Sequence, residues 1–92
     1  MKIPRLYETE IEPMTEKTIY QKYEIPYSGF YWLIAELDLK KGIAFGYANL
    51  NDDQNAEWGY IDLGELRRNG AVQVENWKPV KYKDIAKDEE HD

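Results

Sequence analysis

The chain contains no cysteine, and its only histidine is His91. The lack of cysteine excludes disulfide bonds, thiolate catalysis and cysteine-ligated zinc or iron–sulfur centres, and it is compatible with a reducing, cytoplasmic setting. A histidine-based triad or metal site lacks a plausible centre, because His91 lies in a charged terminal segment. No glycine-rich phosphate loop occurs either. We therefore expect neither an enzyme nor a cofactor site.

Long apolar runs are also missing. No stretch approaches the ~20 apolar residues that a membrane-spanning helix needs, and the first residues lack the apolar core of a signal peptide. We therefore expect no membrane association. The length of 92 residues suffices for one domain with one modest core, and the aromatic content of 14% supplies unusually large side chains to fill it.

Charge is unevenly distributed along the chain. The formal net charge is −6, of which residues 84–92 carry −4 through five acidic residues and Lys87, which leaves −2 for residues 1–83. The sequence therefore predicts a single domain over residues 1–83 and an acidic, disordered tail over residues 84–92. The one candidate for the basic face of a nucleic-acid-binding domain is Lys78, Lys81 and Lys83. This group lies beside the acidic tail, so direct binding of nucleic acid is not expected.

Two segments alternate bulky aromatic and very small side chains. They are Phe45-Gly46-Tyr47-Ala48-Asn49-Leu50 and Glu57-Trp58-Gly59-Tyr60-Ile61-Asp62-Leu63. A period of two is strand geometry, in which successive side chains lie on opposite faces of a sheet. The two segments are therefore predicted to be neighbouring strands that share an aromatic face. Another part of the chain is expected to pack closely against the opposite face, which carries the small side chains.

The remaining pattern predicts further strands and one short helix. Residues 17–25 are typical of a first strand that ends at Pro26, and residues 30–37 are apolar in both parities, as expected for a central strand. Short polar turns at residues 38–42 and 51–55 indicate hairpins. Asp62-Leu63-Gly64-Glu65 fits a capping box for a helix after strand four, with Gly70 beyond its end. Residues 72–75 are predicted to form a short fifth strand, and the spacing of Trp77, Pro79, Val80 and Tyr82 predicts a segment that folds back over the sheet.

The predicted fold class is therefore α+β: a small, mostly antiparallel sheet of four to five hairpin-connected strands with one short helix. Residues 1–16 are expected to form an irregular arm with one helical turn, which its isolated apolar side chains anchor to the sheet. The arm and the short helix are expected to cover the two faces of the sheet.

The chain resembles the DUF2958 family over residues 4–83. The residues that carry this resemblance are Pro4-Arg5-Leu6-Tyr7-Glu8-Thr9-Glu10, Lys17 and Tyr20, Phe45-Gly46-Tyr47, Glu57-Trp58-Gly59-Tyr60, and the Leu63 and Leu66 of the helix. The resemblance implies a small bacterial or archaeal domain that often occurs on plasmids and other mobile elements. It implies no activity, cofactor or catalytic residue.

The aromatic residues Trp32, Phe45, Tyr47, Trp58 and Tyr60 form a stripe that is interpreted in two ways. Core packing is favoured over an exposed binding platform at roughly two to one, since a small sheet needs most of its large side chains inside. If one face is spared, aromatic rings suit a protein interface. The residues that we predict for such a face are Tyr27, Tyr31, Tyr47, Glu57, Trp58 and Tyr60.

Three other candidates have simpler explanations. The loop Asn51–Glu57 resembles a calcium loop, but Ala56 stands where the turn needs glycine, which favours a solvated hairpin loop at roughly nine to one. Glu36, Asp38, Glu57 and Asp62 are candidates for the paired carboxylates of a hydrolase. At about twelve to one, Glu36 and Asp38 instead mark the solvent end of a strand and Asp62 caps a helix. Mimicry of a DNA backbone is a candidate role of the acidic segments at about one in five, and solubility is the favoured explanation.

The sequence thus favours a non-catalytic domain that binds a protein partner through an aromatic and acidic face. The alternative is an acidic inhibitor or DNA mimic that acts on a nucleic-acid enzyme, of the anti-restriction or anti-CRISPR type. A hydrolase is a distant third. The identity of the partner, the oligomeric state and the exposed face of the sheet are left open at this stage.

Overall fold

The computed structural model describes residues 2–89. The elements in chain order are η1, a 3-10 helix (Met14–Glu16), β1 (Thr18–Ile19), β2 (Gln21–Ile25), β3 (Phe30–Asp38), β4 (Ile43–Leu50), β5 (Glu57–Asp62), α1 (Leu63–Arg68), β6 (Val72–Gln73), β7 (Val80–Lys81) and α2 (Tyr82–Glu89). Among these residues, no helix is long and apolar enough to cross a membrane.

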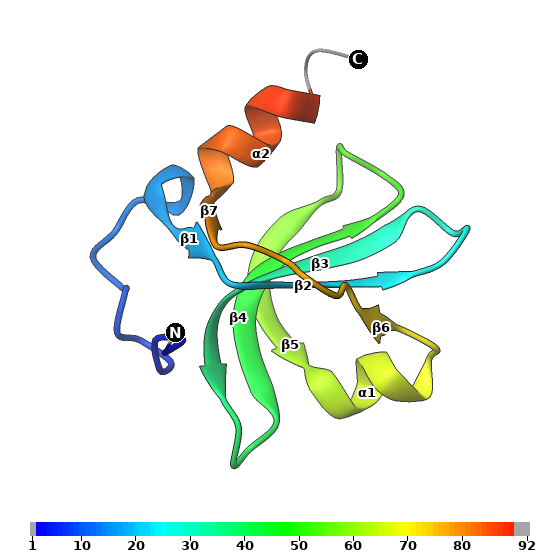
Figure 1. Ribbon diagram of the computed structural model, residues 1–92, viewed down its shortest axis with the longest axis horizontal. Coiled ribbons are helices and arrows are strands. Elements are labelled where there is room, and N and C mark those ends of the chain that lie inside the picture. The colour runs from blue at the N-terminus through cyan, green and yellow to red at the C-terminus, as the bar shows by residue number, and fades with distance from the viewer. Residues whose placement is uncertain (1, 90–92) are drawn as a thin grey trace.

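A five-stranded antiparallel sheet in the order β5-β4-β3-β2-β6 dominates the structure (Figure 1). The predicted mostly antiparallel sheet is confirmed, and β3 is its central strand. The hairpins β3–β4 and β4–β5 also form as predicted. In the second hairpin Phe45 lies opposite Tyr60, Gly46 opposite Gly59 and Tyr47 opposite Trp58. The two aromatic segments therefore do share one face of the sheet.

The first predicted strand is divided at Tyr20. Residues Thr18 and Ile19 pair with Lys81 and Val80 in a separate two-stranded sheet, whereas residues 21–25 pair with β3. The returning C-terminal segment provides the partner of β1, and strand propensity contains no information on so distant a contact. The predicted helix after strand four consequently follows β5, and a second helix, α2, is present as well.

One face of the large sheet packs against α1. Its core contains Trp32 and Ile34 from β3, Ile61 from β5, and Leu63 and Leu66 from α1. Helix α1 begins where the Asp62 side chain accepts a hydrogen bond of 3.1 Å from the Glu65 amide, as the predicted cap requires. Gly70, with φ of 91°, has the left-handed conformation predicted beyond the helix end.

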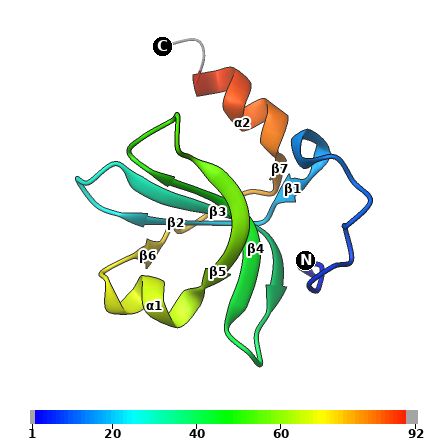
Figure 2. The same ribbon diagram turned by 180° about the vertical axis from the view of Figure 1, so that it is seen from behind.

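The opposite face forms a second core with both terminal segments. Ile19, Leu33 and Ala35 are buried there, and Trp77, Tyr82 and Ile85 pack against them. The Trp77 indole donates to the Ile19 carbonyl oxygen at 3.1 Å. Figures 1 and 2 show β7 and α2 beside β1, at the end of the molecule opposite α1.

The segment that was predicted to be an acidic tail contributes Ile85 to this second core. Residues 82–89 form α2, so the expectation of a disordered tail from residue 84 is wrong for residues 84–89. The reason is that Tyr82 and Ile85 give the helix an apolar side that packs against the second core. The net charge of the segment does not reveal this apolar side. Residues 90–92, and with them His91, lie outside the described residues.

A β-bulge in β3 explains the glycine at position 46. The register with β4 shifts between Ile34 and Glu36, and this shift turns the Glu36 side chain to the face of Leu33 and Ala35, opposite Phe45. A Cβ atom at Gly46 would lie 1.8 Å from the carbonyl oxygen of Leu33, whereas one at Gly59 would meet nothing within 4 Å. The small face is therefore tightly packed at Gly46 and open at Gly59.

Candidate functional site

Six aromatic rings form a continuous row on the face of the sheet that carries the second core. Neighbouring ring centroids lie 5.4 to 6.4 Å apart, within the range of favourable aromatic contacts. In order along the row they are Tyr31, Tyr47, Trp58, Phe45, Tyr60 and Tyr7. We call this set the aromatic row. It runs from β3 across β4 and β5 to the N-terminal arm.

The middle of the aromatic row is covered by α2. The Tyr82 ring lies 5.0 Å from Tyr47 and 5.1 Å from Trp58, and both of these side chains are half-buried. This part of the row is core, which the sequence favoured over an exposed platform. The packing also explains why α2 is held against the sheet.

The end of the aromatic row formed by Tyr60 and Tyr7 is exposed. Tyr60 is 59% and Tyr7 is 61% accessible to solvent, although their rings lie 6.1 Å apart. The hydrogen bond between their hydroxyl groups raises the pKa of Tyr60 to about 12, and the nearby carboxylates of Glu36 and Glu10 act in the same direction. The hydroxyl groups of the two exposed rings are therefore coupled to each other.

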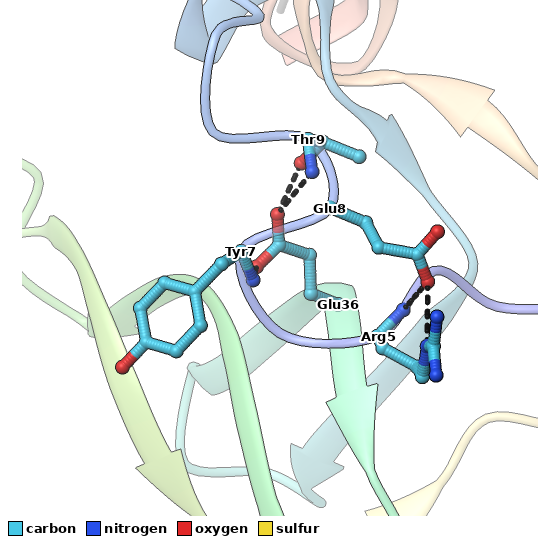
Figure 3. Close-up of polar contacts among 5 residues, drawn as sticks. All are labelled: Arg5, Tyr7, Glu8, Thr9 and Glu36. Carbon is cyan, nitrogen blue, oxygen red and sulfur yellow. Dashed lines mark hydrogen bonds and ion pairs between the residues drawn. The ribbon is translucent and has the colours of Figure 1, made fainter.

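The N-terminal arm is held beside Tyr60 by a buried carboxylate. Glu36 is only 3% exposed, and its oxygens accept hydrogen bonds from the Tyr7 amide at 2.8 Å, the Thr9 amide at 3.0 Å and the Thr9 hydroxyl (Figure 3). Tyr7 itself has a φ of 72°, an uncommon conformation that this arrangement stabilises. A buried acceptor with three donors fixes the arm far more tightly than exposed apolar contacts would.

A buried lysine completes this anchor. Lys17 is 2% exposed, and its ammonium group donates to the Thr9 carbonyl oxygen and, at 2.8 Å, to the Thr9 hydroxyl. The Lys17 nitrogen also lies 5.8 Å from the centre of the Phe45 ring. The Thr9 hydroxyl thus connects the two buried ionisable side chains, because it donates to Glu36 and accepts from Lys17.

These contacts correct one sequence-based expectation and extend another. Glu36 does not mark the solvent end of a strand, because the bulge turns it under the arm. Apolar side chains of the arm do contact the sheet, since Ile3 packs against the first core and the Tyr7 ring lies beside that of Tyr60, although Ile11 is 97% exposed. The polar group is an additional anchor that the sequence did not predict.

The predicted binding residues do not all come together. Tyr31, Tyr47, Trp58 and Tyr60 belong to the aromatic row. Tyr27 lies in the β2–β3 turn, fully exposed and with a φ of 68°. Glu57, opposite Ala48, points to the other face of β5 from Trp58 and Tyr60. Trp32, which was assigned to the stripe, packs in the first core instead, because it pairs with Ala48.

The candidate carboxylates are not assembled into one site. Glu36 is buried under the arm, Asp38 accepts from the Lys41 amide at the β3–β4 turn, and Glu57 points to the opposite face of the sheet from Glu36. In the Asn51–Glu57 loop, Asp52 and Asp53 accept hydrogen bonds from side chains and an amide of the same hairpin. Within the described residues, no cluster of histidine or carboxylate side chains is arranged to hold a metal ion.

Sequence reasoning did not assign four contributors to this site. The expectation that the arm anchors to the sheet and that the segment with Tyr82 folds back over it is confirmed, but no local pattern related Tyr7 or Tyr82 to the aromatic row. Lys17 and Glu36 look like ordinary surface residues in the sequence. The one available signal was that Glu36 interrupts an otherwise apolar segment, residues 30–37, that was predicted to be buried on both faces.

No protein-family model, no curated protein and no solved structure matches this chain. The resemblance to the DUF2958 family, and the association with mobile elements that it implies, therefore stay predictions.

Proposed function

We propose that this chain is a non-catalytic domain that binds a protein partner through the exposed end of the aromatic row and the adjoining edge of β5. The observation that carries the proposal is the pair Tyr7 and Tyr60, two large rings that are held in place and yet more than half exposed. Tyrosine is enriched at the energetic centre of protein interfaces, because it buries a large area at a small loss of side-chain entropy.

The anchoring of Tyr7 supports this proposal. A free N-terminal arm would have to be ordered when a partner binds, which weakens affinity. Here the Glu36 carboxylate orders the arm beforehand through the amides of Tyr7 and Thr9. A preorganised aromatic pair at a sheet edge is a suitable binding surface.

The alternative function, an acidic inhibitor that mimics DNA, has weaker support in the described residues. Glu8 forms an ion pair with Arg5, and Glu16 forms ion pairs with both Lys81 and Lys83. Hydrogen bonds from the Arg5 amide and then its guanidinium lower the pKa of Glu8, and hydrogen bonds from Lys81 and Lys83 lower the pKa of Glu16. The ion pairs reduce the negative field that a mimic needs. A cytoplasmic setting, based on the cysteine-free composition, is part of the proposal.

The test compares a row variant with a matched tyrosine outside the row. Tyr60→Thr removes the ring but keeps strand propensity, and Tyr27→Asn removes a fully exposed ring at a position whose positive φ asparagine tolerates. In affinity capture followed by quantitative mass spectrometry, we expect Tyr60→Thr to lose the partner and Tyr27→Asn to retain it.

Salt distinguishes the two functions. Exposed charges are screened within ~10 Å at about 0.1 M salt, so an interface based on aromatic contacts should survive about 0.5 M salt, whereas a DNA mimic should release its enzyme. Retention of the partner by Tyr60→Thr, or its loss at modest salt in the unaltered protein, would contradict the proposal.

A further inference from the structure

Strand β5 ends the large sheet and pairs only with β4 among the described residues (Figure 2). Gly42 and Leu63 face each other one position beyond the Ile43–Asp62 pair, and the Leu63 amide donates to the Gly42 carbonyl oxygen at 2.9 Å. Hydrogen-bonded and non-hydrogen-bonded pairs alternate along an antiparallel ladder, so the pairs that contain Trp58 and Tyr60 are non-hydrogen-bonded. The backbone N–H and C=O groups of Trp58 and Tyr60 therefore point away from β4, toward the open side of β5.

Two acidic residues stand at the two ends of this edge. Glu57 begins β5 and Asp62 ends it, and no basic residue lies between them. Their side chains point to opposite faces of the sheet, because they are five positions apart. Gly59 lies between them on the same face as Glu57, with open space where a side chain would be.

The charges of β5 favour a basic partner over a second copy of this chain. Strand β5 contains two acidic residues and no basic one, so a second β5 strand would offer neither Glu57 nor Asp62 a residue of opposite charge. Oppositely charged residues that face each other across two strands stabilise the pairing. The arrangement therefore favours a strand with basic residues opposite both positions.

We propose that an extended basic segment of a partner protein adds to the sheet as a further strand beside β5. This inference rests on the proposed function and specifies its partner. The segment carries Lys or Arg at two positions five residues apart, which face Glu57 and Asp62. A large apolar side chain opposite Gly59 occupies the open space there. Main-chain hydrogen bonds to Trp58 and Tyr60 provide affinity, and the charges determine the register.

The probe for this proposal is the synthetic peptide acetyl-Lys-Val-Thr-Phe-Thr-Lys-amide, which has this spacing in antiparallel register. Two matched peptides serve as controls: one has glutamate in place of both lysines, and one has N-methyl groups on the amides that would face β5. Binding is followed by amide chemical shifts and hydrogen exchange in the full chain. We expect the lysine peptide to slow exchange of the Trp58 and Tyr60 amides about tenfold and both control peptides to bind at least tenfold more weakly.

A charge-neutral variant tests the recognition of the peptide. Glu57→Gln with Asp62→Asn removes both charges, and asparagine preserves the cap of α1. We expect this double variant to bind the lysine peptide about three- to tenfold more weakly, whereas Glu75→Gln, beyond β6 at the other edge of the sheet, should bind it normally.

Three results would overturn the inference. They are equal binding of the N-methylated peptide, shift changes that avoid residues 57–62, and self-association of the chain through β5 in sedimentation experiments. Each of them leaves the proposed function standing if Tyr60→Thr still loses the partner. Conversely, if Tyr60→Thr retains the partner, the proposed function fails whatever the peptide does.

Discussion

Replacement of Gly46 by alanine should destabilise the protein severely, whereas the same change at Gly59, its cross-strand neighbour, should not. A Cβ atom at Gly46 would lie 1.8 Å from the Leu33 carbonyl oxygen and 2.9 Å from the Leu33 carbonyl carbon. Ordinary contact begins at 3.4 Å, so the difference between 3.4 and 1.8 Å, 1.6 Å, must come from movement of the backbone.

The backbone that must move belongs to the central strand. β3 is paired on both sides, with β2 and with β4, so Leu33 cannot move without disturbing a ladder. Overpacking of a core costs about 1–3 kcal/mol, and each weakened hydrogen bond adds about 1 kcal/mol. We therefore expect Gly46→Ala to lower the free energy of unfolding by about 3–5 kcal/mol, out of a total of about 5–14 kcal/mol for a chain of this size.

The measurement is urea unfolding, followed by the fluorescence of the three tryptophans. At about 4–8 °C per kcal/mol for a small domain, the melting temperature should fall by roughly 12 °C or more. Gly59→Ala has open space for its Cβ and should stay within about 0.5 kcal/mol of the unaltered protein. The reasoning is refuted if Gly46→Ala loses less than about 1 kcal/mol, or if the two variants are equally destabilised.

Two further predictions concern the anchored arm. Thr9→Val keeps the side-chain shape but removes the hydroxyl between Glu36 and Lys17. We expect the free energy of unfolding to fall by about 1.5–3 kcal/mol and hydrogen exchange in residues 5–10 to become faster. Thr15→Val, at an exposed site in η1, is the control, and equal exchange in both variants would contradict the role of Thr9. Tyr7→Phe should return the pKa of Tyr60 from about 12 toward its usual value of 10.0, as read from the ring-carbon shifts of labelled tyrosine.

The same tyrosine pair makes stability depend on alkaline pH. A raised pKa means that the folded state holds the Tyr60 proton more tightly than the unfolded state. The contribution to stability is therefore complete below pH 10.0 and is lost as the pH rises toward about 12. In Tyr7→Phe this part of the alkaline loss should disappear, and an unchanged pH profile would contradict the assignment.

Local patterns in the sequence determined the hairpins β3–β4 and β4–β5 of the large sheet and the start of α1. The alternation around Gly46 and Gly59 identified two adjacent strands, and Asp62 with Glu65 located the start of α1. These features depend on side-chain periodicity and on hydrogen bonds between residues a few positions apart, which the sequence contains directly.

Only the tertiary structure decided how the aromatic row is divided into buried and exposed parts. Tyr82 covers Tyr47 and Trp58 because residues 80 and 81 return to pair with β1, more than 60 positions earlier in the chain. Glu36 binds the arm because a bulge turns its side chain toward Tyr7 and Thr9. Contacts between distant segments depend on the packing of the whole chain, and no local pattern in this sequence contains them.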